Sequence, residues 1–241
     1  MNRFIIVLML EWPLLFVSGQ DDHCNCKVDQ RSLFESVLTG QSFQMKNTSG
    51  NQFFHDGSFT GDIILTSGDT VRNKQIGYNG YEDELIWTMP SSLRMIEVDK
   101  ETVAKFILQN TYDEIPVAFK HLRGTTAGDR KIDFFARILL EDSISLYSTH
   151  NIRFDEKIEH NDGGAVTLID RIEPIPPVYY LGLNNNKYLE VKHLRKKYLY
   201  ITLPDYKDAI RTILIKHHLS LRNERDLIRI VQLFNVYKII K

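Results

Sequence analysis

The apolar residues of this chain follow two spacings, one typical of strands and one typical of helices. Up to Lys192 they form short runs separated by turn sequences such as Asn79-Gly80 and Glu141-Asp142-Ser143. Short apolar runs between such turns are typical of β-hairpins. After Pro204 the apolar residues recur at the 3.6-residue spacing of an α-helix. This order predicts an α+β protein, with an antiparallel β-meander roll or sandwich followed by a β-hairpin and two C-terminal packed amphipathic helices.

The strand-like segments can be delimited by the turn residues between them. The segment Gly124–Asp129 is a loop by composition, and the stiff Pro174–Pro177 marks a boundary or a sheet edge, because proline cannot donate a backbone hydrogen bond. The acidic run Glu82-Asp83-Glu84 is expected to be a solvated turn. The predicted strands are Asp62–Thr66, Val71–Tyr78, Glu84–Met89, Met95–Val98, Val103–Leu108, Val117–Leu122, Asp133–Leu140, Ile144–Tyr147, Val178–Leu183 and Tyr188–Lys192.

The two predicted helices each have an apolar stripe and a capping sequence. Thr202 with Asp205 resembles a capping box before the first helix, and Asn223 with Asp226 resembles a cap of the second. The segment just before them, Tyr198–Thr202, favours a strand by propensity. The stripes are Ala209, Ile210, Ile213, Leu214 and His217 in the first helix, and Leu227, Ile228, Val231, Phe234 and Tyr237 in the second.

The N-terminal residues predict export. Residues 1–19 have an early Arg3, an apolar run and small residues before a cut after Gly19, which is the layout of a signal peptide. An uncleaved anchor is the alternative, although the run is short and Glu11 is costly inside a bilayer. We expect a soluble mature protein that is periplasmic or extracellular. The remaining chain divides into a polar segment 20–56 with a short helix at Asp29–Leu38, a β-rich domain 57–175, and the hairpin with two helices at 176–241.

Motifs for metal, cofactor or catalytic sites do not emerge. The two cysteines, Cys24 and Cys26, lack a second Cys/His pair at ligand spacing, so no metal site is predicted. Whether they are bridged, free or paired between molecules stays open. The chain has no phosphate-binding glycine loop, no G-x-S-x-G elbow and no H-E-x-x-H sequence. We therefore expect no cofactor, and no catalytic residue can be assigned.

Charge is distributed unevenly along the chain. The segment 187–241 holds 13 Lys/Arg and 5 Asp/Glu, a local balance of +8 in a chain of net charge −1. The densest cluster is Lys192, Arg195, Lys196 and Lys197, with tyrosines interleaved, a pattern that favours an anionic partner. An exported protein points to an anionic envelope component, and no nucleic acid is expected. Alternatively, these side chains are solvated faces of amphipathic elements, or they pair with the acidic front half.

A sheet edge is the other candidate binding surface. Phe53-Phe54 precede the first strand and Val178-Tyr179-Tyr180 follow the prolines, so these rings either flank an edge that docks a protein strand or fill the core. Self-association along such an edge is a further option.

The chain also resembles a group of secreted, mostly uncharacterised Bacteroidota proteins over about residues 57–241. The likeness is carried by the strand sequence YNGYEDEL and by the C-terminal pattern Pro-Asp-Tyr-Lys, Leu-Ser-Leu and Asp-Leu-Ile. In that group the segment before the proline-initiated helix is helical, unlike the strand propensity of Tyr198–Thr202. The resemblance implies an exported, envelope-associated protein and no particular activity.

Together these features favour a non-catalytic binding or accessory module at the bacterial envelope. The alternative is a small hydrolase with its site in a cleft between the β part and the C-terminal helices. A cleft with converging titratable groups would favour the hydrolase, and a surface patch or open sheet edge would favour binding.

Overall fold

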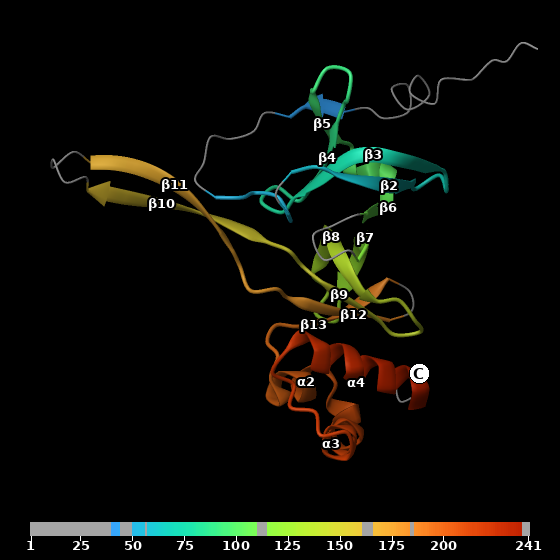
Figure 1. Ribbon diagram of the computed structural model, residues 1–241. Helices are drawn as coiled ribbons and strands as arrows, with labels where there is room; N and C mark the ends of the chain where they lie inside the picture. Colours follow the sequence, from blue (N-terminus) through green and yellow to red (C-terminus); the bar gives the residue numbers. More distant parts are fainter. Residues whose placement is uncertain are drawn as a thin grey trace, which may run out of the picture.

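The computed structural model describes residues 40–43, 50–55, 57–109, 115–160, 166–183 and 186–237. The expected signal peptide, the short helix at Asp29–Leu38 and both cysteines lie outside these residues. Within them, strands come first and helices last, which confirms the α+β class. Figure 1 shows a curled sheet, a barrel and a group of helices following one another along the molecule.

The first part is an antiparallel sheet. Strands β2, β3, β4 and β5 form the expected meander, with paired neighbours joined by turns. The chain then crosses through a 3₁₀ turn, η1, and β6 pairs with β2 rather than with β5. The short strand β1 lies on the outer side of β5. Their bounds are β1 Gly40–Ser42, β2 Phe59–Leu65, β3 Thr70–Asn79, β4 Glu84–Thr88, β5 Met95–Val98, η1 Lys100–Thr102 and β6 Val103–Leu108.

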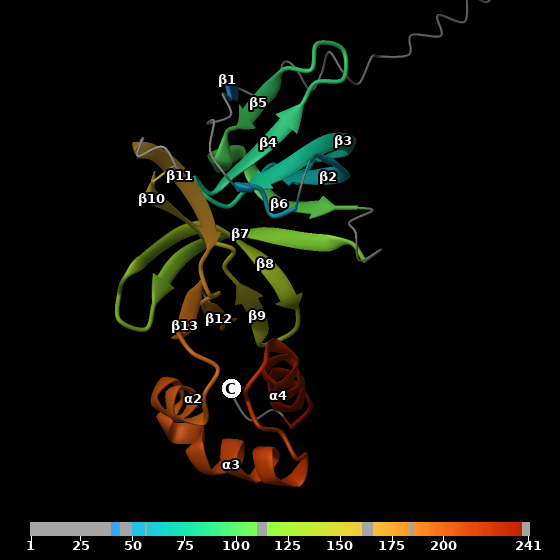
Figure 2. The same cartoon turned by 60° about the vertical axis from the view of Figure 1, so that its left-hand side comes forward.

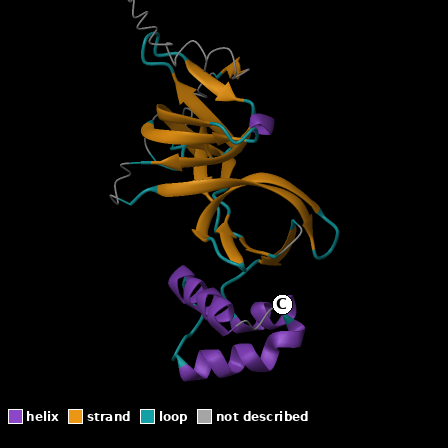
Figure 3. Cartoon of the chain, turned by 90° about the vertical axis from the view of Figure 1, so that its right-hand side faces the viewer, coloured by secondary structure: helices purple, strands orange, loops and turns teal. Residues whose placement is uncertain are grey.

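The second part is a closed five-stranded barrel. Neighbouring strands β7, β8, β9, β12 and β13 pair antiparallel in that order. An odd number of alternating strands can close only with a parallel pair, and β13 pairs parallel with β7 at Lys187–Thr125 and Tyr188–Thr126. Figure 3 shows this ring of strands above the helices. The bounds are β7 Val117–Thr126, β8 Lys131–Leu140, β9 Ser145–Ser148, β12 Tyr179–Gly182 and β13 Lys187–Val191.

Strand β7 joins the two parts of the large sheet. One of its edges pairs with β6 near Val117 and with β13 near Thr125, while the other pairs with β8. The expected loop Gly124–Asp129 is therefore partly wrong, because β7 continues through Thr126. A separate hairpin, β10 (Ile152–His160) with β11 (Val166–Pro174), is inserted between β9 and β12 and projects from the body (Figure 1).

Three helices rather than two follow the barrel. The expected pair is present as α3 (Lys207–Lys216) and α4 (Glu224–Tyr237). The segment with strand propensity forms α2 (Lys196–Thr202) instead, followed by the 3₁₀ turn η2 (Pro204–Tyr206). Tertiary packing overrides propensity here, because the helix buries Leu199 completely against the other helices and the barrel. Figures 1 and 2 show α3 and α4 crossing rather than running side by side.

Of the two predicted helix caps, one is confirmed and one is wrong. The Asn223 side chain accepts a hydrogen bond from the Asp226 backbone N–H at 2.8 Å, as an N-cap does. The Thr202 hydroxyl instead donates to the Glu190 carbonyl oxygen at 3.1 Å, so it ties α2 to β13 and caps no helix.

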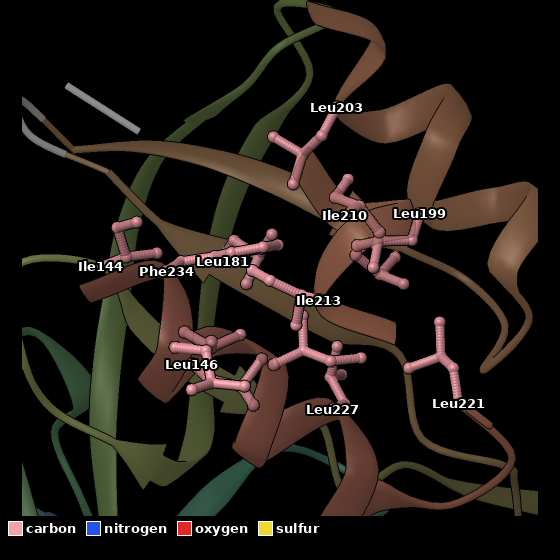
Figure 4. Packing of buried hydrophobic residues seen from close by; sticks show 14 of the residues in the cluster. Ile144, Leu146, Leu181, Leu199, Leu203, Ile210, Ile213, Leu221, Leu227 and Phe234 are labelled. Atoms are coloured by element: carbon pink, nitrogen blue, oxygen red, sulfur yellow. The ribbon is translucent and has the colours of Figure 1, made fainter. Parts of the chain in front are cut away.

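The barrel wall separates two apolar clusters. Alternate residues of β12 point to opposite faces: Tyr180 joins a cluster drawn from all five strands, and Leu181 faces the helices. The helices bury most of their predicted stripes on this outer face, where Figure 4 shows Leu146, Leu181 and Phe234. Tyr237, predicted in the stripe of the second helix, is exposed instead. A third cluster, which includes Phe106 and Phe119, fills the curled sheet. The helices therefore cover one side of the barrel.

Candidate functional site

The predicted basic residues lie at the start of helix α2 and just before it. Lys192 follows β13, Arg195 is the N-cap of α2, and Lys196 and Lys197 form its first turn. All four side chains are exposed. They do not form one compact patch, because they line three separate hollows.

The first hollow lies between the start of α2 and the link that joins α3 to α4. It has a volume of about 450 Å³ and is lined by Leu194, Arg195, Lys196, Ser220, Leu221 and Arg222. Arg222 is distant from the other cations in sequence. Only the folding of the link beside α2 brings it to them, so the sequence contains no signal for it.

The link beside this hollow is held by a carboxylate. Asp226 accepts hydrogen bonds from the Ser220 hydroxyl at 2.8 Å, the Ser220 N–H at 3.3 Å and the Arg222 N–H at 3.4 Å. Burial alone raises the pKa of Asp226, but these hydrogen bonds outweigh it and hold the pKa below its ordinary value. Between them Leu221 has a φ of 54° and a completely buried side chain.

The second hollow combines apolar and basic lining residues. It is lined by Lys197, Tyr200, Ile201, Pro204 and Lys207, with a volume of about 600 Å³. Ile201 is 63% exposed, which is unusual for a large aliphatic residue. The Lys207 ammonium lies 6.0 Å from the centre of the Tyr200 ring, at the limit of a cation–π contact. Ile201 was not predicted, because the segment 198–202 favours a strand by propensity, and Lys207 lies at the start of a different helix, α3.

The third hollow lies between the β7–β8 turn, β13 and α2. Its volume is about 380 Å³. Arg130 donates to the Tyr180 hydroxyl at 3.1 Å and to Glu190 at 2.8 Å, and the Lys192 ammonium lies 4.0 Å from the same carboxylate. Lys192 is thus partly neutralised and separate from the other predicted cations. The lining residues are Thr126, Ala127, Gly128, Arg130, Leu189, Glu190, Lys192, Ile201 and Thr202.

The remaining cations around α2 have no acidic partner in the described part of the chain. Arg195, Lys196, Lys197, Lys207 and Arg222 form no ion pair with any carboxylate there. The alternative in which the basic segment pairs with the acidic front half is thus not observed for these five residues. They present uncompensated positive charge to solvent.

The sheet edge is a weaker candidate for docking a protein strand than the sequence suggests. Among the described strands, the large sheet ends at β1 on one side, and this terminal strand is only the three exposed residues Gly40–Ser42, while the other side closes into the barrel. The aromatic residues proposed as edge neighbours are mostly in the core: Phe53, Tyr179 and Tyr180 are buried. The edge itself is therefore short and without a pocket of exposed rings.

The acidic run at the β3–β4 turn was predicted to be solvated, and Glu82 is exposed, but Asp83 is partly buried and makes structural contacts. Asp83, with a φ of 59°, accepts hydrogen bonds from the Tyr78 hydroxyl at 2.7 Å and from the Phe135 N–H at 3.0 Å, and pairs with Lys100. Burial raises the pKa of Asp83, and the hydrogen bonds from Lys100 and Tyr78 oppose that rise. The carboxylate therefore fastens the turn to β8.

The neighbouring Glu84 predicts a pH dependence of stability. Burial, with the charges of Glu97 and Glu82, raises the pKa of Glu84 from 4.5 to about 7. A raised carboxyl pKa means that ionisation is less favourable in the folded state, so stability falls as the pH rises from 4.5 to 7. Replacing Glu84 by glutamine should leave stability unchanged at pH 4 and raise it by about 1 kcal/mol at pH 8, after discounting for partial exposure.

Urea unfolding of both proteins at the two pH values measures this effect. Asp205→Asn, which removes an exposed carboxylate from the helical part, controls for the loss of one negative charge. A gain for Glu84→Gln that is equal at pH 4 and pH 8 would contradict the raised pKa.

The described ranges contain neither a helix suited to span a membrane nor a cluster of metal-binding side chains. No helix there combines the length and the apolarity needed to cross a membrane. The same residues contain no group of three or more His, Cys, Asp or Glu side chains placed to hold a metal ion.

The basic hollows around α2 thus form the candidate site on the basis of the chain's own geometry. No protein-family model, curated protein or solved structure matches the chain.

Proposed function

We propose that this protein is an exported, non-catalytic binding module that attaches to an anionic surface of the bacterial envelope through α2. The observation that carries the proposal is two groups of cations without an ion-pair partner in the described chain. Arg195, Lys196 and Arg222 line one hollow beside α2, and Lys197 and Lys207 line another together with the exposed Ile201. The expected signal peptide and the resemblance to secreted Bacteroidota proteins support the location.

The chemistry of this surface suits a membrane with anionic headgroups. A basic side chain near such a surface contributes about 1 kcal/mol of attraction. Inserting Ile201 among the acyl chains would add up to about 2 kcal/mol. The combination of a basic rim and one apolar anchor is that of a short interfacial helix, whose inner side, here Leu199, stays in the protein core.

The competing proposal is a small hydrolase with a cleft between the β part and the helices. The hollow in that place, between the barrel and α2, has Glu190 as its only lining carboxylate. Arg130 and Lys192 both engage that group. Hydrolysis by paired carboxylates needs a second acid in the same cleft, and the lining residues do not supply one, so the geometry favours binding.

Charge reversal tests the proposal. The double variant Lys196→Glu/Lys197→Glu should bind vesicles of phosphatidylcholine and phosphatidylglycerol about 100-fold more weakly at low ionic strength, since four units of charge change at the contact surface. Both residues are exposed and unpaired with carboxylates of the described chain, so folding should be preserved. Co-sedimentation with vesicles measures the binding.

The matched control carries the same change of net charge at the other end of the molecule. Arg72→Glu/Arg94→Glu alters two exposed residues of the curled sheet and should bind within about threefold of wild type, because these charges lie far from the contact surface relative to the screening length. Failure of wild type to bind these vesicles, or an equal loss in the control, would refute the proposal.

A further inference from the structure

The hollow between α2 and the α3–α4 link has the features of a specific anion site. Two arginines and one lysine, Arg195, Arg222 and Lys196, line it together with Ser220. None of its lining residues is acidic. Arginine is suited to phosphate because its planar donors can bind two oxygens at once.

We infer that this hollow binds the phosphate monoester headgroup of a membrane lipid. The inference rests on the proposed function and names the lipid chemistry that the surface selects. A phosphate monoester carries about −1.5 to −2 charge at neutral pH, whereas a diester carries about −1. Three cations that form no ion pair in the described chain match the monoester better. The volume of about 450 Å³ lies within the range of small-molecule sites.

Both walls of the hollow are fixed before any ligand arrives. On one side, Asp226 holds the link through Ser220 and Arg222. Leu221 keeps a left-handed backbone, which costs energy in a residue other than glycine, and its buried side chain retains it there. Arg222 therefore projects from a link whose backbone is determined by its neighbours.

On the other side, Arg195 is flanked by residues of the helical core. Leu194 packs against that core, and Leu199 is completely buried in it. The backbone N–H of Tyr198 donates to the Arg195 carbonyl oxygen at 2.9 Å, which holds Arg195 at the start of α2. A backbone that is fixed at both walls lowers part of the ordering cost of binding, because only the cationic side chains remain to be ordered. The hollow is therefore better suited to one headgroup than a diffuse basic surface would be.

Two vesicle compositions of equal surface charge test the inference. Phosphatidylcholine is mixed with phosphatidic acid, a monoester, or with phosphatidylglycerol, a diester. Wild type should prefer phosphatidic acid by about tenfold, and Arg222→Gln should lose most of that preference, since one charge-assisted hydrogen-bonding group is removed. On phosphatidylglycerol, Arg222→Gln should bind no more than about twofold more weakly, because only a general surface charge is lost.

Arg225→Gln is the matched control. It removes the same charge three residues later, from an exposed position of α4 that does not line the hollow. This control should keep the preference for phosphatidic acid. Asp226→Ala removes no cation but frees the link, and should also abolish the preference; circular dichroism and a thermal melt verify that α4 remains folded.

The possible results distinguish headgroup binding in the hollow from binding to the general basic surface. Equal binding of wild type to both vesicles would overturn the headgroup site and leave the proposed function standing. Loss of preference in Arg225→Gln as large as in Arg222→Gln would overturn it as well. Binding to soluble glycerol 3-phosphate, lost in Arg222→Gln, without binding to either vesicle would overturn both the lipid source and the proposed function.

Discussion

Replacing Phe234 by alanine should lower the free energy of unfolding by about 4 kcal/mol, because it removes a large side chain and leaves a cavity. Phe234 is completely buried in the cluster between α4, the other helices and the outer face of the barrel, and Figure 4 shows it beside Ile144 and Leu181. Val236→Ala is the matched control on the same helix. Its side chain is 71% exposed, so its loss should change stability by less than about 0.5 kcal/mol.

Two spectroscopic probes show how far the effect of Phe234→Ala spreads. Far-ultraviolet circular dichroism follows the helices, and the fluorescence of Trp87, buried in the curled sheet, follows the first part of the chain. After the expected cut at Gly19, Trp87 is the single tryptophan of the chain. We expect both transitions to shift together to lower denaturant, because α4 is attached to the barrel and β7 joins the barrel to the curled sheet.

The attachment of α4 to the barrel involves polar contacts as well as apolar ones. The Asn235 side chain donates to the Ile144 carbonyl oxygen at 3.0 Å and accepts from the Ile144 N–H at 2.8 Å. At the other end of the helix, Glu224 pairs with Arg137 of β8. A helical signal that is lost at lower denaturant while the Trp87 transition stays in place would contradict this coupling.

Most strands could be predicted because their signals are local. Met95–Val98 and Val103–Leu108 form strands with the predicted bounds, and the turns at Asn79-Gly80 and Glu141-Asp142-Ser143 each separate two paired strands. Even so, the left-handed residue of the first turn is Asp83, not Gly80, because a contact with β8 holds Asp83 there. Turn chemistry therefore located the hairpin but not its detailed conformation.

The features that sequence patterns missed depend on contacts between distant segments. The barrel closes through a pairing of Lys187 with Thr125, and no local pattern encodes a parallel partner so far along the chain. The same reason explains α2, since the burial of Leu199 among the helices outweighs the strand propensity of Tyr198–Thr202.

The candidate site also contains residues that the sequence indicates and residues that only the fold brings together. Arg195, Lys196 and Lys197 are adjacent in sequence, so composition alone indicated them. Arg222 and Lys207 join them only after the helices fold back beside α2. The prediction wrongly grouped Lys192 with these cations, because its neighbour in space is Glu190. Charge counting found the basic segment, and the packing of the helices decides which of its residues act together.

Replacing Gly124 by alanine should lower the free energy of unfolding by about 3 kcal/mol, through backbone strain and the loss of closing hydrogen bonds. Gly124 has a φ of 157°, and a Cβ atom there would collide with the carbonyl oxygen of Asn186, just where β13 meets β7. The hydrogen bonds at risk run from the Thr125 N–H to Asn186 at 3.2 Å and from the Ala127 N–H to Tyr188 at 3.1 Å.

The measurement is urea unfolding combined with amide hydrogen exchange, in which the Thr125 and Ala127 amides should lose most of their protection in Gly124→Ala. Gly128→Ala is the matched control, since a Cβ atom at that position meets open space; it should be neutral or stabilise slightly by reducing the freedom of the unfolded chain. The third hollow depends on the same closure, because its walls include Thr126 of β7 and Glu190 of β13. Equal stability of the two variants would mean that the parallel pair contributes little, and that the helices rather than the strands hold the barrel shut.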